Sequence, residues 1–239
     1  MKPVGLSIIL PVHNESGYLP LFYRRLVHVL RRAPCTYEVI FVENGSTDGS
    51  YEILKALTKK SPYCTVIRSE KGWGNAVRYG LQKAQGLLFC YMVTDGQIDP
   101  IHILRLYSYY ENHRTDVVKI RRVTRENTER LVISRMYNVF AGFLFGFSSR
   151  DINATPKLLK TDLAKSLKLH SKNIALDVEL LIKLRASGKH WAEIGVQSNA
   201  RTEGVSTTNV AAVFEMIASL LRFRYGTIKE FLSNNHDTT

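Results

Sequence analysis

The sequence has few cysteines: three in 239 residues, at Cys35, Cys64 and Cys90. Their odd number and wide spacing exclude both a C-x-x-C zinc site and a paired disulfide framework. We therefore expect buried thiols in a reducing compartment. Because 45% of the residues are hydrophobic and 10% aromatic, the composition also excludes disordered and collagen-like classes, and the fold must come from a packed core.

Long uninterrupted apolar segments are also absent. The longest apolar stretches are broken by Arg135, Asn138 or Arg222, well short of the roughly 18–20 clean residues that span a bilayer. Residues 1–3 lead directly into a strand-like segment, without the three regions of a signal peptide. These absences predict a cytoplasmic protein that does not cross the membrane.

Acidic residues are scarce, with 21 Asp and Glu against 33 Lys and Arg, for a net charge of +12. Such an excess favours an anionic partner, which nucleic acid, an acidic membrane surface or a phosphorylated small molecule would each provide. No nucleic-acid-binding motif accompanies the charge, so we expect no nucleic-acid partner.

Strand and helix patterns alternate along the first part of the chain. The continuous apolar run at 6–12 predicts a strand buried on both faces, and the apolar stripe at 19–30 predicts a helix that Pro34 ends. Repetition of this β–α unit predicts a parallel, right-handed α/β sheet. Further strands are predicted at 38–42, 65–68, 87–93, 117–120 and 190–196, and further helices at 51–57, 75–84, 101–112, 127–147, 175–186 and 210–224.

Polar loops follow the predicted strands at their carboxyl ends, where open α/β sheets bind ligands. A segment at 71–75 opens a helix, where backbone N–H groups would suit a phosphate, although G-x-G there is more often a sign of tight packing. Neither G-x-x-x-x-G-K-[ST] nor G-x-G-x-x-G follows the first strand, which argues against P-loop and dinucleotide-binding proteins. The loops and the segment are Pro11-Val12-His13-Asn14-Glu15, Glu43-Asn44-Gly45-Ser46-Thr47-Asp48-Gly49, Lys71-Gly72-Trp73-Gly74-Asn75 and Asp95-Gly96-Gln97-Ile98-Asp99-Pro100.

Together, and in this order, these segments resemble the successive motifs of family 2 glycosyltransferases with the GT-A fold, in particular the dolichol- or polyprenyl-phosphate sugar synthases. The resemblance continues through 129–135, Asp151 and 201–206 to about Arg224. It implies an α/β, Rossmann-like, mostly parallel sheet flanked by helices. We expect one domain over 1–239, with a nucleotide-sugar-binding half at about 1–112, an acceptor half with amphipathic helices at about 113–232 and a flexible tail at 233–239.

The resemblance further implies inverting transfer of a hexose from a nucleoside-diphosphate sugar, of the GDP-mannose or UDP-glucose type, to a polyprenyl or dolichyl phosphate. Mg²⁺ or Mn²⁺ would hold the diphosphate. The expected metal ligands are Asp95 and Gln97, and the expected catalytic residues are Asp95, Gln97 and Arg201. The expected nucleotide-sugar contacts are Pro11, His13, Glu15, Glu43, Ser46, Lys71, Gly72 and Asp95.

One position departs from the family pattern. The usual D-x-D falls on Val93-Thr94-Asp95, and valine cannot bind a metal. Three hypotheses follow: the site binds metal weakly through Asp95 and Gln97, the cation is dispensable, or the chain is a catalytically silent nucleotide-sugar-binding homologue.

Basic residues are concentrated between 113 and 135. In the related synthases this region resembles the acceptor-phosphate site, which maps onto Arg121, Arg130, Ser134 and the later Arg201. Arg130 and Ser134 share one helix face, so a guanidinium and a hydroxyl would converge on one phosphate. A solvated basic face is the alternative interpretation of the cluster. A saccharide hydroxyl acceptor would instead need a carboxylate base, for which Asp99 and Glu179 are the candidates.

The same segment continues as an apolar stripe at helical spacing, from Val132 to Phe147. Core packing is one explanation, and a helix in the membrane interface is the other. A second such helix is predicted before Arg222 and Arg224. We expect peripheral contact with an anionic membrane at its cytoplasmic face, and the pattern allows a membrane-protein subunit or a homo-oligomer.

Overall fold

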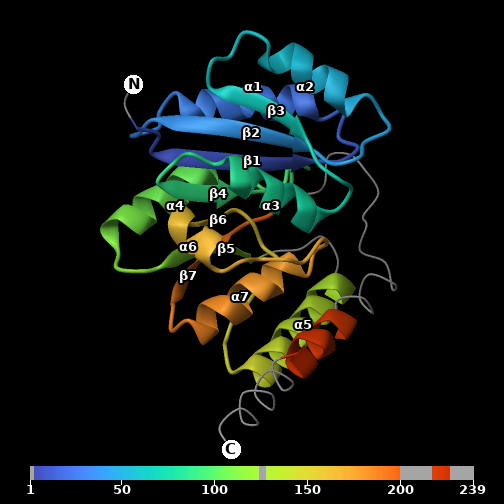
Figure 1. Cartoon of the computed structure of the whole chain (residues 1–239), viewed down its shortest axis with the longest axis vertical. Helices are drawn as coiled ribbons and strands as arrows, with labels where there is room; N and C mark the ends of the chain where they lie inside the picture. Colours follow the sequence, from blue (N-terminus) through green and yellow to red (C-terminus); the bar gives the residue numbers. More distant parts are fainter. Residues whose placement is uncertain (1–2, 124–127, 200–216, 227–239) are drawn as a thin grey trace, which may run out of the picture.

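The computed structural model describes residues 3–123, 128–199 and 217–226, without the side chains of 128–131. Seven strands form one mixed sheet in the order β3-β2-β1-β4-β6-β5-β7 (Figure 1). The strands are β1 (Leu6–Val12), β2 (Tyr37–Glu43), β3 (Cys64–Arg68), β4 (Leu88–Tyr91), β5 (Val117–Arg122), β6 (Lys157–Lys160) and β7 (Trp191–Val196).

Six of the strands run in one direction. β1 pairs in parallel with β2 and β4, β2 with β3, and β5 with β7, whereas β6 is antiparallel to both β4 and β5. The carboxyl ends of the six strands therefore meet at one edge of the sheet. The predicted strands are confirmed, but β6 was not predicted, because a four-residue strand with lysine at both ends has no strand-like apolar run.

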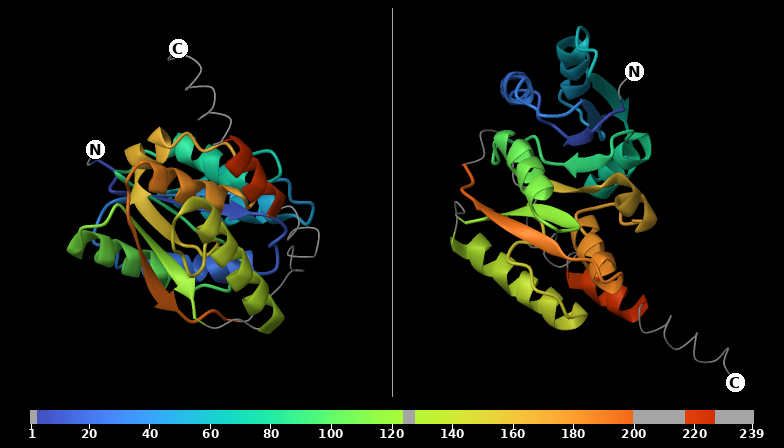
Figure 2. Two further views of the ribbon diagram at one scale, coloured as in Figure 1. Left: turned by 90° about the horizontal axis from the view of Figure 1, so that it is seen from below. Right: turned by 90° about the vertical axis from the view of Figure 1, so that its left-hand side faces the viewer.

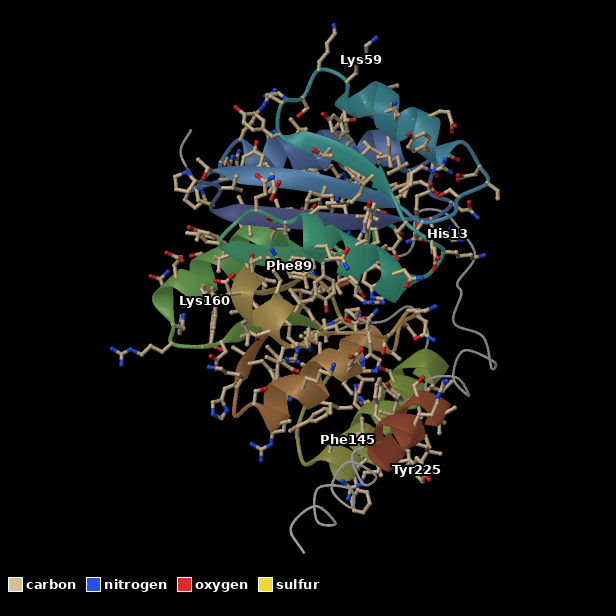
Figure 3. The ribbon with its side chains drawn as sticks, in the orientation of Figure 1. His13, Lys59, Phe89, Phe145, Lys160 and Tyr225 are labelled. Atoms are coloured by element: carbon tan, nitrogen blue, oxygen red, sulfur yellow. The ribbon has the colours of Figure 1, made fainter. Side chains whose placement is uncertain are left out.

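Helices cover both faces of the sheet (Figure 2). One buried cluster packs α1 (Leu19–Leu30), α2 (Ser50–Thr58) and α4 (Ile101–Asn112) against one face. A second cluster lies on the other face and includes Phe89, labelled in Figure 3. Its helices are α3 (Trp73–Lys83), α5 (Thr128–Phe145), α6 (Thr161–Ser166) and α7 (Leu176–Ala186).

Residues 217–226 are helical and lie beside α5 at the end of the molecule farthest from α1 and α2 (Figures 1 and 2). Leu220 is buried in the same cluster as Tyr137 and Ala141 of α5. Within the part of the chain that the structure describes, no helix is both long enough and apolar enough to cross a bilayer.

The three cysteines are free thiols. Cys90 is buried, as predicted, but Cys35 and Cys64 are only half-buried, so the expectation of buried thiols is wrong for two of the three. Burial raises the pKa of all three thiols, which keeps them protonated at neutral pH.

A glycine lets α3 pack closely on the sheet. A Cβ added to Gly80 would overlap Cγ2 of Ile9 on β1, both of which are buried. The overlap should cost about 1–3 kcal/mol, whereas alanine should gain about 1 kcal/mol in helix propensity over glycine. Gly80→Ala should therefore lower the free energy of unfolding. Urea unfolding monitored by circular dichroism measures the change, with Gln82→Ala on the exposed side of α3 as the control. A Gly80→Ala variant as stable as the parent would contradict this packing.

Candidate active site

The loops that follow β1 and β2 are joined by reciprocal hydrogen bonds. The Asn14 N–H donates to Ser46 Oγ at 3.1 Å, and the Thr47 N–H donates to Asn14 Oδ1 at 2.8 Å. Asn14 has a positive φ of 54°, which asparagine tolerates better than most residues. The predicted contact residue Ser46 therefore shapes the β1 loop through its hydroxyl.

Asp48 also connects the loops that follow β1 and β2, near the residues where those loops end. Its carboxylate accepts the Ser16 N–H at 2.9 Å and both the N–H and the hydroxyl of Ser50, at 3.0 and 2.6 Å. Burial raises the pKa of Asp48, but the hydrogen bonds from Ser50 and Ser16 outweigh it and lower the pKa to about 2. Asp48 is therefore ionised at neutral pH, and it makes one rigid unit of the two loops.

Glu43 is buried at the carboxyl end of β2. One carboxylate oxygen accepts the Ser46 N–H at 2.5 Å, and the other accepts Nε of Arg68 at 2.9 Å. Burial opposes its ionisation, but these hydrogen bonds lower the pKa of Glu43 below its usual value. Its predicted nucleotide contact stays a prediction, as do those of Pro11, His13 and Glu15.

The start of α3 is packed rather than open. A Cβ on Gly72, whose φ is +131°, would collide with the carbonyl oxygen of Lys172, and one on Gly74 would collide with that of Ser171. The Asn75 N–H donates to the Lys172 carbonyl at 3.1 Å. The structure thus favours tight packing over a phosphate site at this helix terminus. Lys71 itself is exposed.

The loop after β4 holds Asp95 at the same edge of the sheet. Asp95 is buried, and its Oδ1 accepts the Gln97 N–H at 3.1 Å. The preceding Thr94 donates its hydroxyl to the Pro11 carbonyl at 3.2 Å, which fixes this loop to the end of β1. The carboxylate expected to bind the metal therefore lies next to the β1 loop.

The donor set for a metal is small. Among the described residues, no three His, Cys, Asp or Glu side chains gather in a group that could hold a metal ion. One carboxylate with the Gln97 amide still suits Mg²⁺ or Mn²⁺, because Mg²⁺ is commonly held by one or two carboxylates, with substrate phosphates and water completing its shell. The residues present therefore fit a cation that arrives with a diphosphate.

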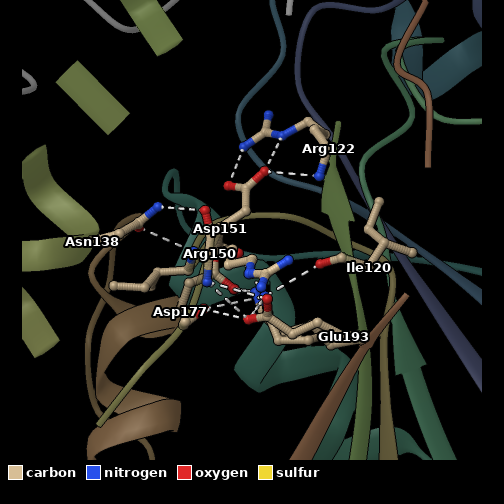
Figure 4. Close-up of polar contacts among 11 residues, drawn as sticks. Ile120, Arg122, Asn138, Arg150, Asp151, Asp177 and Glu193 are labelled. Atoms are coloured by element: carbon tan, nitrogen blue, oxygen red, sulfur yellow. Dashed lines mark hydrogen bonds and ion pairs between the residues drawn. The ribbon is translucent and has the colours of Figure 1, made fainter. Parts of the chain in front are cut away.

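Arg122, the last residue of β5, lies close enough to Asp95 to feel its charge. Its Nε and Nη2 donate to the two carboxylate oxygens of Asp151 at 2.8 and 2.9 Å, and its backbone N–H also donates to Asp151 (Figure 4). Burial alone would lower the pKa of Arg122, but the negative charges of Asp151 and, more weakly, Asp95 outweigh burial and raise the pKa above its usual value. Arg122 is therefore a permanently charged, rigidly held guanidinium at the site.

Arg121 points elsewhere. A Cβ on Gly195 of β7 would lie 3.3 Å from Arg121 Nη2, so this side chain lies over β7. The resemblance assigned the acceptor phosphate to Arg121 and left out Arg122. Adjacent residues of a strand face opposite sides of a sheet, so the sequence alone could have indicated that Arg121 and Arg122 do not point to the same place.

Of the other residues expected at the acceptor phosphate, the described part of the chain includes the side chain of Ser134. Ser134 is half-buried on α5. Arg201, the side chain of Arg130 and the predicted tail at 233–239 lie outside the described residues.

Two lysines of the sheet are fully buried. Lys119 belongs to the basic cluster between 113 and 135, and its burial shows that it is part neither of a solvated basic face nor of an exposed phosphate clamp. Lys157 was given no role from the sequence. Lys119 donates to the Asp151 carbonyl at 2.6 Å and pairs with Glu193 at 3.1 Å. Burial lowers the pKa of Lys119, while Glu193 and Asp151 oppose that shift. Lys119 therefore holds the main chain of the residue that orients Arg122.

Lys157, on β6, pairs with the buried Asp177. Asp177 also accepts the Tyr91 hydroxyl at 2.8 Å and the Trp73 indole N–H at 3.2 Å. The buried ion pair therefore connects β6 and β4 to the first residue of α3.

The carboxylates considered as a general base are engaged in other contacts. Glu179 is buried, pairs with Lys183 at 2.8 Å and accepts the backbone N–H groups of His170 and Ser171. Burial opposes ionisation of Glu179, but these contacts lower its pKa. Asp99 accepts the Ile101 N–H at 2.8 Å at the start of α4. Each carboxylate thus has a structural role.

Curated relatives include the undecaprenyl-phosphate 4-deoxy-4-formamido-L-arabinose transferase of Yersinia enterocolitica, 25% identical over 219 residues that cover 90% of this chain. The dodecaprenyl-phosphate galacturonate synthase of Rhizobium johnstonii is 24% identical over 226 residues, 92% of this chain. The chain spans 66% and 67% of the lengths of these two relatives.

Solved structures with a similar fold include the glucosyl-3-phosphoglycerate synthase of Mycobacterium tuberculosis. Its complex with Mn²⁺, UDP and glucosyl-3-phosphoglycerate has a TM-score of 0.72 at 17% identity, and its complex with Mg²⁺ and UDP has 0.73 at 18%. Each match covers 93% of this chain and 80% of the other. The similarity confirms the expected GT-A fold.

Residues 7–172 match the family model for glycosyl transferase family 2. The matched region runs from β1 through the segment that covers the start of α3, and it contains the Asp95 loop, Arg122 and Asp151. The chain belongs to glycosyl transferase family 2.

Proposed function

We propose that the chain is an inverting glycosyltransferase that moves a sugar from a nucleoside-diphosphate sugar to a polyprenyl phosphate. The observation that carries this proposal is the Arg122 guanidinium, fixed by Asp151 beside the Asp95 loop. The relatives that are named for transfer to undecaprenyl and dodecaprenyl phosphate support the acceptor class.

A phosphate acceptor suits a site of this composition. Its oxygen is already an anion at neutral pH, so attack on the sugar needs no general base. Asp151 takes the Nε hydrogen and one Nη2 hydrogen of Arg122, so both Nη1 hydrogens and the other Nη2 hydrogen remain. One Nη1 hydrogen and the remaining Nη2 hydrogen form a planar pair of donors that matches phosphate geometry. In the proposed reaction this oxygen bonds to the anomeric carbon while the bond from that carbon to the diphosphate breaks. The nucleoside diphosphate leaves from the opposite side, which inverts the configuration.

On the donor side, Asp95 and Gln97 would hold Mg²⁺ or Mn²⁺. The structurally similar synthase binds UDP with Mn²⁺ or Mg²⁺, which supports a divalent cation at the Asp95 loop. Such a cation neutralises the charge that develops on a departing diphosphate. The joined β1 and β2 loops, with Pro11, His13 and Ser46, would form the nucleoside-binding edge, and Glu43 would set its shape.

The structure favours the phosphate acceptor over a saccharide hydroxyl. A hydroxyl needs a base, and the two candidate carboxylates, Asp99 and Glu179, are already engaged in hydrogen bonds to the backbone. Because a polyprenyl phosphate resides in a lipid bilayer, we also propose that the protein works as a peripheral protein at the cytoplasmic face of a membrane.

Replacing Asp95 should separate turnover from folding. Asp95→Ala should reduce transfer by at least about a hundredfold, because the cation that stabilises the leaving diphosphate loses its one carboxylate ligand. Transfer is measured with a panel of UDP- and GDP-sugars and a polyprenyl phosphate, with Mn²⁺ or with chelator. Asp162→Asn, an exposed change on α6, is the control. Full activity of Asp95→Ala in chelator would refute the metal site. If the unchanged protein binds nucleotides but transfers no sugar from any donor of the panel, the chain is the catalytically silent homologue.

Substitution of the two neighbouring arginines should have different effects on use of the acceptor. Arg122→Gln should lower kcat/KM for the polyprenyl phosphate by at least about a hundredfold, whereas Arg121→Gln should change it by less than about tenfold. Arg122→Lys should recover only part of the loss, because an ammonium cannot reproduce the bidentate fork. Because Arg122 pairs with the buried Asp151, thermal unfolding and nucleotide binding of each variant serve as folding controls. A larger loss of kcat/KM for Arg121→Gln than for Arg122→Gln would instead support Arg121 as the residue that binds the acceptor phosphate.

A further inference from the structure

Arg68 is an exposed guanidinium held along one edge by a buried carboxylate. It is the last residue of β3, an edge strand of the sheet, and it lies opposite Glu43 in the register of β2 and β3 (Figure 1). Its Nε donates to Glu43 at 2.9 Å, and its side chain is 61% exposed whereas that of Glu43 is 1% exposed. The hydrogen bond and charge of Glu43 raise the pKa of Arg68 above its usual value, so this guanidinium is permanently charged.

An aromatic ring covers one flat face of the same guanidinium. Cζ of Arg68 lies over the ring of Tyr51, 4.6 Å from its centroid. Tyr51 is the second residue of α2, which packs beside β3. Guanidinium groups stack flat on aromatic rings, because both are planar and the ring quadrupole attracts the cation. With Glu43 at one edge and Tyr51 on one face, the plane of the guanidinium is fixed, and its other face is open.

The open face of Arg68 is not needed for the ion pair. Within the part of the chain that the structure describes, Glu43 is the one hydrogen-bond partner of Arg68, and it takes only Nε. An ion pair of this kind would form equally well with a lysine, which has no flat face. The planar surface and the two Nη groups are therefore available to a ligand.

The open face lies at the carboxyl edge of the sheet, next to the joined β1 and β2 loops. The Ser69 N–H donates to the Glu43 carbonyl at 2.9 Å, so the chain that leaves β3 continues alongside β2. A Cβ added to Gly45 in the β2 loop would lie 3.2 Å from Cβ of Lys71, so this chain then lies against that loop. A nucleoside held at these loops is therefore within reach of Arg68.

We propose that Arg68 is the stacking platform for the nucleobase of the sugar donor, with the base flat against its open face and Tyr51 beneath it. The inference rests on the proposed function, because the ligand is the nucleoside diphosphate of that donor. Glu43 is too deeply buried to meet the base and instead positions Arg68. Every nucleobase has a π face, so the platform accepts uracil and guanine, and the larger purine makes the larger contact.

Stacking differs from simple attraction to the diphosphate in two ways. Stacking needs a planar side chain, whereas attraction to a phosphate needs only a positive charge. Stacking also needs a base in the ligand, whereas attraction to a phosphate does not. A variant that keeps the charge and a ligand that lacks the base therefore separate the two contacts.

The test is isothermal titration calorimetry of the full chain with UDP, GDP and ribose 5-diphosphate, each with Mg²⁺. Arg68→Lys keeps the charge and a partner for Glu43 but removes the plane, so it should weaken UDP and GDP binding by at least about threefold and leave ribose 5-diphosphate binding unchanged. Arg68→Met should weaken UDP and GDP binding by at least about fivefold. Thermal unfolding of each variant serves as the folding control, because Arg68→Met leaves a buried carboxylate without its cation.

Lys55 offers a matched control variant. Its Nζ lies 5.8 Å from the centroid of the same Tyr51 ring, and it is exposed on α2. Lys55→Met removes one positive charge, as Arg68→Met does, but it leaves the platform in place. It should bind UDP and GDP as the parent does.

Three results would overturn the stacking proposal. The first is equal binding of UDP and GDP by the parent and Arg68→Lys, because the charge alone would then be sufficient. The second is an equal loss with ribose 5-diphosphate, which would assign Arg68 to the phosphates or to the shape of the loop. The third is equal binding of UDP and GDP by the parent and Arg68→Met, which would leave Arg68 as an ion pair without a ligand.

Sugar transfer by the same proteins separates this proposal from the proposed function. A parent that binds UDP or GDP but transfers no sugar to a polyprenyl phosphate contradicts the proposed function alone, because stacking is measured without an acceptor. A parent that transfers sugar, with Arg68 variants that bind both nucleotides as the parent does, contradicts the stacking platform alone.

Discussion

The site depends on the compensation of two positive charges that lie inside the protein. Lys119 and Lys157 have no solvent exposure, and an unpaired ammonium in such a place would cost several kcal/mol. Lys119 is neutralised by Glu193 and holds the main chain at Asp151, and Lys157 is neutralised by Asp177. The ordering of Arg122 and of the start of α3 thus follows from the need to pair these lysines.

The two sides of the site are held by different kinds of interaction. On the donor side, short polar side chains such as Asn14 and Asp48 bind backbone N–H groups of the neighbouring loop, so the loops keep their shape but remain near the surface. On the proposed acceptor side, an ion pair with the buried Asp151 holds Arg122. Breaking one partner of a buried pair is far more costly than removing one loop hydrogen bond, so the acceptor side is the less tolerant of substitution.

The sequence predicted the elements whose apolar pattern matches their burial, such as β1 and α1, and it predicted the Asp95 loop. It missed β6, because Lys157 is buried by an ion pair that only the folded chain supplies. It did not distinguish Arg121 from Arg122, since the side of a strand that faces the site depends on pairing with β6 and β7. It also could not show that the stripe of α5 is buried only in part, because periodicity shows which residues share a face but not what covers that face.

The segment at 171–173 lies directly against Gly72 and Gly74, a hundred residues earlier in the chain. The loop expected to meet the nucleotide therefore acquires its final shape only after the chain has been synthesised to about residue 173. Contacts that close so large a loop are slow to form, so this part of the molecule should be among the last to order during folding. An unfinished chain on the ribosome would then carry the first four strands without a finished form of the proposed nucleotide site, which delays ligand capture until Arg122 and Asp151, proposed for the acceptor side, are already present.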